Sequence, residues 1–255
     1  MITLLNGEKW DTPQLIEKMY DDEFYYGHLG KYALSSSSIK MLLKSPKTYK
    51  YVTKYGSSND SQALRDGKLF HTMVLEPHKI DDLHFVDVAS KNTNKYKLAK
   101  EQYGEVFTNK ERQGAERLTD ALLRNEAALQ CLQNAEYEVP AAAMIQGIAF
   151  RAKADILQGN TIIDVKTTQD LSTFRYSADK YGYDLQAYLY KEMFGVDNFI
   201  FLVIDKGSCD IGVFECSEDF YNKGKQKLNE GIENYKYFFA TEGVDVDQYV
   251  MRGIL

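Results

Sequence analysis

The sequence predicts an α/β (α+β) protein in which helices flank a mixed central sheet. Helical patterns dominate the first half of the chain, three consecutive strand patterns occupy the middle, and helix and strand patterns alternate afterwards. A run of strands followed by helices and further strands is typical of a sheet that helices cover. The chain contains no internal repeat and no low-complexity linker that would divide it.

The helices of the first half are predicted from caps and breakers. They are expected at residues 12–20, 39–44, 45–55, 62–76 and 96–133. Thr12 caps the first helix, with Pro13 at its first position, and serines precede the second. Pro77 ends the fourth helix, a break is expected in the last one near Thr108, and residues 56–61 have the composition of a polar loop.

The strands of the second half are predicted from β-branched and apolar runs. Three consecutive antiparallel strands are expected at residues 135–144, 147–157 and 161–166, and later strands at 198–205 and 210–215. Gly159 and Asn160 tolerate positive φ angles and suit a tight hairpin turn between the second and third strands. Helices are expected at residues 173–181, 183–194 and 217–239.

Composition and charge indicate an ordinary globular protein. The chain has 255 residues, 44% of them hydrophobic and 27% charged, which is enough for one large domain. We expect neither a transmembrane segment nor a signal peptide, and the three cysteines lack the spacing of a disulfide framework or a zinc site, so a reducing cytoplasm fits best. The net charge of −6 counts against a general nucleic-acid coat, but it allows a nuclease with a carboxylate metal site.

Three charged residues of the second and third strands are the most informative. The hairpin brings Asp155 near Asp164, and Lys166 leaves the same face as Asp164 because the two are two residues apart. A divalent metal between the carboxylates, with a phosphate beside Lys166, would satisfy all three charges. Asp-x-Lys by itself is common on solvated strands, so the surrounding residues decide between the two interpretations.

Two helices carry further candidate residues. His71 follows Gly67 by four residues, and a glycine inside a helix often marks a close approach by another backbone or a ligand. His71 is either a core histidine or a metal ligand beside the two aspartates. Gln186 and Tyr190 share one face of the helix at residues 183–194. They either pack on the sheet or act at the site, with Gln186 holding the lysine or the attacking water and Tyr190 supporting the phosphate backbone.

These residues occur in the order found in the PD-(D/E)XK nuclease superfamily. More narrowly, the chain resembles the RecE-type phage and prophage exonucleases and the RecB-like nuclease domains. The residues that carry the resemblance are, in chain order, the serine run at 34–38 with Ser45-Pro46 and Tyr49, Gly67 with His71 and Pro77, Asp155, the stretch 163–168, and Gln186 with Tyr190. The likeness implies a restriction-endonuclease-like core. It implies one nuclease domain over residues 1–255, with a helical N-terminal part at 1–60, a catalytic core at 61–216, and a C-terminal helix and tail at 217–255.

The resemblance also implies a metal site and its chemistry. The implied ligands of one or two Mg²⁺ ions, with Mn²⁺ as a substitute, are His71, Asp155, Asp164 and the backbone carbonyl of Val165. Lys166 would orient or help deprotonate the attacking water and stabilise charge on the scissile phosphate. Some relatives have an extra acidic ligand from the preceding strand, for which Glu136 and Glu138 are both candidates.

The serine run suggests a phosphate site. Four successive serines exceed what helix capping needs, and a helix N-terminus with hydroxyl groups can bind a phosphate. Our hypothesis is that Ser35 and Ser37, with Arg65, grip a terminal or adjacent DNA phosphate, and capping alone is the alternative. A DNA path or, alternatively, a solvated run of charge is expected from Lys91, Lys95, Lys97 and Lys100.

The function implied by the resemblance is a metal-dependent exonuclease that acts on double-stranded DNA ends, in the 5′→3′ direction, and leaves single-stranded overhangs for phage recombination by strand annealing. The implied partners are a single-strand-annealing protein and further copies of the chain in a homo-oligomeric ring, without membrane contact, in the cytoplasm of a host if a phage encodes the chain. Three alternatives are a single-strand or structure-selective nuclease of the RecB-like group, a non-catalytic DNA-end-binding protein on the same fold, and a metal-free protein whose Asp-x-Lys has no function.

Overall fold

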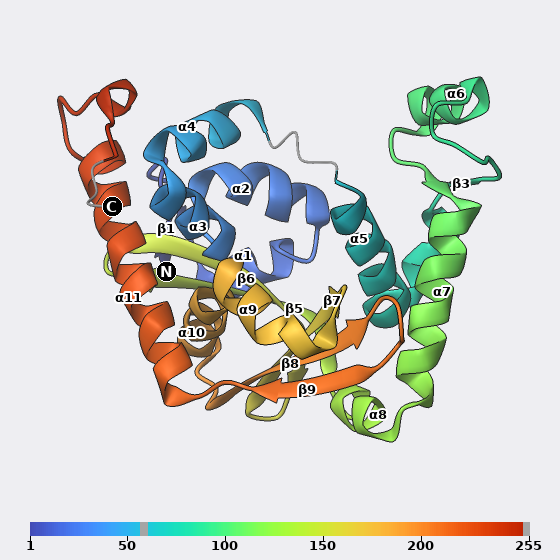
Figure 1. Cartoon of the computed structure of the whole chain (residues 1–255). Coiled ribbons are helices and arrows are strands. Elements are labelled where there is room, and N and C mark those ends of the chain that lie inside the picture. The colour runs from blue at the N-terminus through green and yellow to red at the C-terminus, as the bar shows by residue number, and fades with distance from the viewer. Residues whose placement is uncertain (57–60, 252–255) are drawn as a thin grey trace.

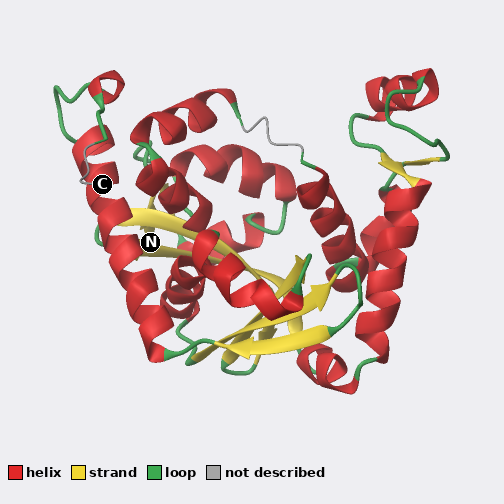
Figure 2. Cartoon of the chain, in the orientation of Figure 1, coloured by secondary structure: helices red, strands yellow, loops and turns green. Residues whose placement is uncertain are grey.

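The computed structural model describes residues 1–56 and 61–251. A five-stranded mixed sheet lies at its centre, and helices cover both faces (Figure 1, Figure 2). In order across the sheet, the strands are β5 (Glu136–Ile145), β6 (Ile148–Gln158), β7 (Thr161–Thr168), β8 (Asn198–Asp205) and β9 (Ile211–Glu215). Strands β7 and β8 are parallel, and the other neighbours are antiparallel. The predicted fold class and the five predicted strands are confirmed.

The α-helices in the described part of the chain follow the expected order. They are α1 (Thr12–Lys18), α2 (Leu29–Tyr32), α3 (Ser36–Lys44), α4 (Pro46–Tyr55), α5 (Gln62–Leu75), α6 (Asn94–Tyr103), α7 (Asn109–Arg124), α8 (Glu126–Leu132), α9 (Phe174–Lys180), α10 (Tyr183–Phe194) and α11 (Glu218–Tyr235). The helical region expected at 96–133 is three helices. The break expected near Thr108 is present, because Thr108 and Glu111 form a capping box that starts α7, and a second break occurs where Asn125 caps α8. The polar loop expected at 56–61 lies largely outside the described residues.

Short elements that no pattern in the sequence predicts complete the fold. The two-residue strands form two small pairs, β1 (Ile2–Thr3) with β2 (Lys9–Trp10), and β3 (Phe85–Val86) with β4 (Phe107–Thr108). The short helical turns are Glu23–His28, Pro77–Asp82, Leu171–Thr173, Lys236–Ala240 and Val246–Gln248. None of the helices within residues 1–56 and 61–251 combines the length and the apolar character that crossing a membrane requires.

Two apolar clusters hold helices against the sheet, one on each face. Helices α3, α9, α10 and α11 pack on one face, where Ile162 and Phe201 are buried. Helices α5, α7 and α8 pack on the other face, where Ile163 and Leu202 are buried. Neighbouring residues of one strand belong to different clusters because side chains alternate across a sheet. Burial on both faces explains why β7 and β8 are almost continuously apolar.

The N-terminal part of the chain reaches the sheet through Leu34. The Leu34 N–H donates to the Ala149 carbonyl, and the Leu34 carbonyl accepts from the Arg151 N–H, which makes a parallel bridge opposite Phe150 of β6. This edge of β6 is free for Leu34 because β6 pairs with β7 only through residues 156–158. Since α3 begins two residues after Leu34, the bridge fixes where α3 starts relative to the sheet.

Candidate active site

Strands β6 and β7 separate at Asp155. Their ladder ends at the pair Ile156–Ile163, and beyond it the Asp155 carboxylate accepts a hydrogen bond of 2.8 Å from the backbone N–H of Val165. The alternation of the β6 side chains between the two faces of the sheet changes at the same place. Ala154 and Ile156 belong to clusters on opposite faces, although residues two apart share a face in a regular strand. The Asp155 side chain therefore replaces a backbone partner and is held at the opening between the strands.

Glu138 lies across from Asp155 on β5. The residue pairs on either side keep one register, which places these two acidic residues opposite each other. The Glu138 φ of 51° is left-handed, a conformation that costs a non-glycine residue about 1–3 kcal/mol and that clusters at functional sites. Burial, and then the charges of Asp155 and Glu76, raise the pKa of Glu138 to about 8. Glu138 is thus a carboxyl group whose charge is poorly compensated by the protein.

The structure places Glu138, and not Glu136, beside the other candidate ligands. The Glu136 side chain is exposed to solvent. A signal for this choice exists in the sequence, because the turn at residues 146–147 sets the register of β5 and β6. Counting seven residues outward from the pair beside that turn, Ile145–Ile148, leads to Glu138 and Asp155.

His71 reaches the same opening from α5. Its Nε2 lies 2.5 Å from the carbonyl oxygen of Val165, and its Nδ1 lies 3.6 Å from the Asp155 carboxylate. Ligand atoms of His71, Glu138 and Asp155 all lie within 4.8 Å of one another. Among the described residues, no lysine or arginine forms an ion pair with either of these carboxylates. Two carboxylates, an imidazole and a nearby carbonyl form a donor set that fits a divalent cation such as Mg²⁺ or Mn²⁺.

Asp164 and Lys166 form a buried ion pair next to this group. Asp164 is 1% exposed, the Lys166 ammonium contacts one of its carboxylate oxygens, and Gln186 Nε2 donates to the other at 2.7 Å. Burial raises the pKa of Asp164, and Lys166 opposes that shift. Burial works against the charged form of Lys166, but Asp164 and Asp155 outweigh it and raise the pKa of the ammonium. Asp164, expected as a metal ligand, is here engaged by Lys166 and Gln186 and lies outside the group of close donor atoms.

Two expectations for α10 are corrected. Gln186 holds Asp164 instead of the lysine, because its amide N–H donates to the Asp164 carboxylate, and its contact with an attacking water stays a prediction. Tyr190 is 9% exposed and packs edge-on against Phe199, with ring centroids 6.1 Å apart. Burial raises the pKa of Tyr190 well above its ordinary value. A side chain that is buried in the core does not support a DNA backbone, so Tyr190 has a packing role.

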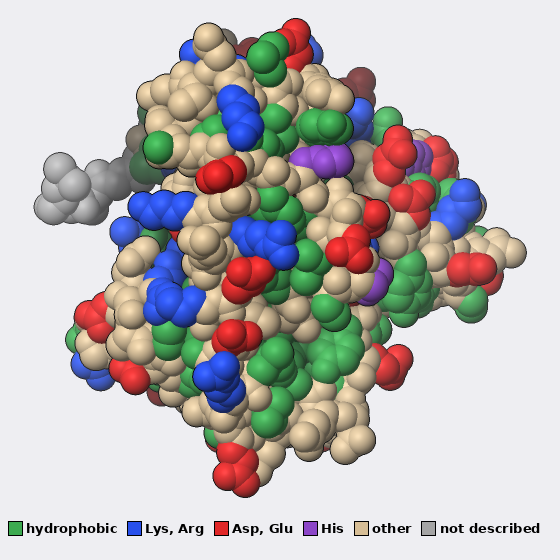
Figure 3. Space-filling model, turned by 90° about the vertical axis from the view of Figure 1, so that its right-hand side faces the viewer, with side chains coloured by type: hydrophobic (Ala, Val, Ile, Leu, Met, Phe, Trp, Pro, Cys, Tyr) green, Lys and Arg blue, Asp and Glu red, His purple; other side chains and the backbone are tan. Residues whose placement is uncertain are grey.

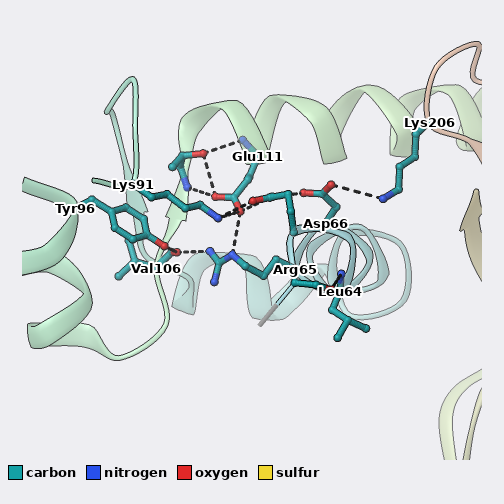
Figure 4. Close-up of polar contacts among 11 residues, drawn as sticks. Leu64, Arg65, Asp66, Lys91, Tyr96, Val106, Glu111 and Lys206 are labelled. Atoms are coloured by element: carbon teal, nitrogen blue, oxygen red, sulfur yellow. Dashed lines mark hydrogen bonds and ion pairs between the residues drawn. The ribbon is translucent and has the colours of Figure 1, made fainter. Parts of the chain in front are cut away.

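The expectation for Arg65 is corrected as well, because Arg65 belongs to a buried polar network between α5 and α7 (Figure 4). It is 6% exposed, its Nε ion-pairs with Glu111 at 3.0 Å, and its Nη2 donates to the Val106 carbonyl at 2.5 Å. Lys91 contacts the same carboxylate at 2.7 Å. Burial opposes the charge of Glu111, but the hydrogen bonds from Lys91 and its other partners outweigh it and lower the pKa to about 2. Arg65 therefore joins α5 to α7 and does not face a phosphate site.

Helix capping accounts for part of the serine run at residues 35–38. Ser35 is the N-cap of α3 and accepts a hydrogen bond of 3.3 Å from the Ser38 N–H, so capping accounts for it. Ser37 is exposed, and its contact with a phosphate stays a prediction.

Two lysines of the run at residues 91–100 have partners within the protein. Lys91 pairs with Glu111 and Lys95 donates to the Asp87 carbonyl. Acidic and basic side chains are interspersed on the face that carries α6 and α7 (Figure 3), which favours a solvated run of charge over a DNA path.

Replacing Glu138 by glutamine should change the pH dependence of stability. The folded-state pKa of Glu138 is raised, so the folded protein keeps a proton that the unfolded chain loses, and stability falls as pH rises from about 4.5 towards about 8. Glu138→Gln removes this loss. In EDTA, we expect its Tm to exceed that of the wild type by a few degrees at pH 8.5 and by much less at pH 5, given about 2–4 °C per kcal/mol for a chain of this size.

The same variant should bind a divalent cation more weakly, by about tenfold or more. Titration with Mn²⁺ followed by Tm measures both effects in one experiment, and Glu136→Gln is the matched control. An equal Mn²⁺ response in the Glu138→Gln and Glu136→Gln variants would contradict a ligand role for Glu138.

The chain is similar to a protein family and to solved structures over most of its length. The family model described as a PDDEXK-like domain of unknown function (DUF3799) matches residues 35–244. No curated protein matches the chain. The crystal structure of a “putative exonuclease” from Eubacterium rectale is similar with a TM-score of 0.62 and 14% identity, covering 92% of this chain and 95% of that chain. A phage-related exonuclease from Haemophilus somnus 129PT is 14% identical over 82% of this chain and 95% of that chain, with a TM-score of 0.35. The first likeness shows a shared fold, and the second is too distant to carry an argument.

Proposed function

The chain belongs to the family of PDDEXK-like domains of unknown function, DUF3799, and on that premise we propose that it is a metal-dependent DNA exonuclease. The observation that carries the proposal is the opening between β6 and β7. There, His71, Glu138 and Asp155 bring their ligand atoms within 4.8 Å of one another beside the buried pair of Asp164 and Lys166. A candidate cation site thus lies next to a fixed ammonium, a combination that can stabilise the charge that develops during phosphodiester hydrolysis.

The cation would be held by His71, Glu138, Asp155 and the carbonyl of Val165. Carboxylate, imidazole and carbonyl donors suit Mg²⁺, with Mn²⁺ as a substitute. When bound, such a cation supplies Lewis-acid stabilisation of the charge that develops on the phosphate oxygens. The Val165 N–H fixes the Asp155 carboxylate from the side of β7, so this ligand is oriented before any cation arrives.

Lys166 would act on the phosphate and on the attacking water. Asp164 holds its ammonium in place, and Gln186 in turn fixes the Asp164 carboxylate. A side chain positioned in this way stabilises charge on the scissile phosphate without reorganising during the reaction. In the metal-free protein, Asp164 and Asp155 raise the pKa of Lys166 and favour its charged form, which suits the orientation of water and charge stabilisation.

The finer features of the proposal depend on the resemblance to RecE-type exonucleases. They are attack on duplex DNA ends in the 5′→3′ direction, production of overhangs for phage recombination, cooperation with a single-strand-annealing protein, and a ring of several copies. A ring would reconcile the net charge of −6 with DNA binding, because basic side chains need only line the channel. The alternatives are a nuclease selective for single strands and a non-catalytic DNA-end-binding protein.

Digestion of linear duplex DNA, labelled separately at its 5′ and 3′ ends, tests the proposal. With Mg²⁺ we expect labelled mononucleotides from the 5′ label first, no release in EDTA, and no attack on closed circular duplex, which has no ends. Earlier release of the 3′ label would reverse the proposed direction, and attack on single strands alone would favour the first alternative. DNA binding without Mg²⁺-dependent cleavage of any substrate would favour the non-catalytic alternative.

A further inference from the structure

A second lysine enters the active site from α3. The Lys40 ammonium lies 5.4 Å from the centre of the Tyr183 ring, and the Lys166 ammonium lies at the same distance from the same ring. Lys166 has Asp164 as its carboxylate partner. Among the residues that the structure describes, the Lys40 ammonium has no carboxylate within ion-pair distance and no hydrogen bond. The ring of Tyr183 is thus shared by one paired and one unpaired cation.

Segments far apart in the chain bring Lys40 to this place. The bridge of Leu34 to β6 sets the start of α3, and α3 then packs against α10 and α11 (Figure 1). The Lys40 stem runs over Gly182, whose φ is +62°, and a Cβ at this glycine would lie 3.4 Å from Lys40 Cε. A glycine at this position therefore allows both the left-handed turn before α10 and the passage of the lysine stem.

The carboxylates that face Lys40 have other lysines as partners. The groups that face it are Lys166 and Asp164 from β7, Asp184 from α10 and Lys227 from α11. Asp164 is already bound by Lys166 and Gln186, and Asp184 is bound by Lys227 at 2.7 Å. Both carboxylates that face Lys40 are therefore engaged by other lysines, and among the described residues Lys40 has no counterion of its own in its partly buried position. Burial, and next the charge of Lys166, lower the pKa of Lys40 to about 8, a shift that a bound anion would reverse.

We propose that Lys40 is a phosphate-binding residue, which holds a DNA phosphate beside Tyr183, next to the one that is cleaved. This inference rests on the proposed nuclease function. The anion is a phosphate because the cation site and Lys166 receive the scissile phosphate at the same opening, and the neighbouring phosphate of the same strand follows within one nucleotide. That phosphate is either an internal diester or the terminal 5′-phosphate, and the substrates below distinguish them.

The test compares Lys40→Met, Lys40→Arg and the control Lys44→Met, which removes an exposed lysine from the same helix. Binding of a short duplex is measured in EDTA over a range of salt concentrations, so that no cleavage occurs. We expect Lys40→Met to weaken binding about tenfold and to reduce the slope of log K against log salt concentration by about one phosphate contact. Lys40→Arg should restore most of the slope, and Lys44→Met should leave it unchanged.

Two modified duplexes then identify the phosphate. If Lys40 binds an internal diester, a methylphosphonate at the second linkage from the 5′ end, next to the scissile first linkage, should abolish the difference between wild type and Lys40→Met. If it binds the terminal group, a 5′-hydroxyl end should abolish that difference.

A wild-type salt slope in Lys40→Met, or the same loss in Lys44→Met, would overturn the inference even if the protein cleaves DNA. Conversely, the protein could fail to cleave DNA while Lys40→Met still reduces the slope of log K for DNA binding against log salt concentration. That result would support the inference and contradict only the proposed catalytic activity. Absence of any DNA binding by the wild type would overturn both.

Discussion

Replacing Lys166 by methionine should reduce kcat for DNA cleavage by about 10²–10⁴-fold while leaving DNA binding in EDTA close to that of the wild type. Methionine keeps much of the volume and removes the charge, so the loss reports the ammonium itself. The expected pattern is a fall in kcat with a nearly constant KM, because Lys166 is proposed to act on the transition state more than on the bound substrate. Single-turnover digestion of an end-labelled duplex in Mg²⁺ measures it.

Stability needs a separate control in this experiment. Lys166→Met leaves the Asp164 carboxylate buried without its partner, which costs about 3–5 kcal/mol when one member of a buried pair is removed. The double variant Asp164→Asn/Lys166→Met removes both charges, and we expect it to regain most of the lost Tm without regaining activity. Near-wild-type turnover in Lys166→Met would refute the role assigned to the lysine. Recovery of activity together with Tm in the double variant would show that the loss was one of folding.

Gly224→Ala should destabilise the protein by about 3 kcal/mol or more, the largest stability effect that we expect from adding one methyl group. Gly224 is buried in α11 where that helix crosses α10. A Cβ there would lie 2.1 Å from the carbonyl oxygen of Asp184 and 2.8 Å from Tyr188 Cβ. Backbone cannot rotate away as a flexible side chain can, so the two helices must separate. Denaturant unfolding of the purified variant measures the change.

Gly67→Ala is the matched control, since it makes the same change inside another helix. The sequence allows a close approach by another backbone or a ligand at Gly67. The structure shows no close backbone, because a Cβ there would meet no atom within 4 Å, and the approach of a ligand stays a prediction. Alanine should therefore stabilise α5 by roughly 0.5–1 kcal/mol through its higher helix propensity. A destabilised Gly67→Ala variant, or a Gly224→Ala variant as stable as the wild type, would contradict this account of helix packing.

Local rules account for the part of the site that the sequence predicts. A two-residue turn and the period of two along a strand are enough to bring Asp155, Asp164 and Lys166 together. The same rules, applied to the turn before β6, also select Glu138 over Glu136. The caps of α3, α5 and α7 follow from short-range preferences in the same way, since each serine or threonine cap accepts a hydrogen bond from a backbone N–H three residues on.

The sequence by itself determined the fold class, the strands of the central sheet, and the acidic hairpin with its lysine, because turns and side-chain alternation act between neighbours along the chain. Only the tertiary structure decided that Arg65 and Tyr190 are buried in structural roles and that Gln186 holds Asp164. It also decided that Lys40 stands beside Lys166 with no carboxylate partner among the residues that the structure describes. These outcomes depend on which helices from distant parts of the chain pack on each face of the sheet. Packing sets both the access of a side chain to solvent and the charges that surround it, and neither quantity is encoded in sequence spacing.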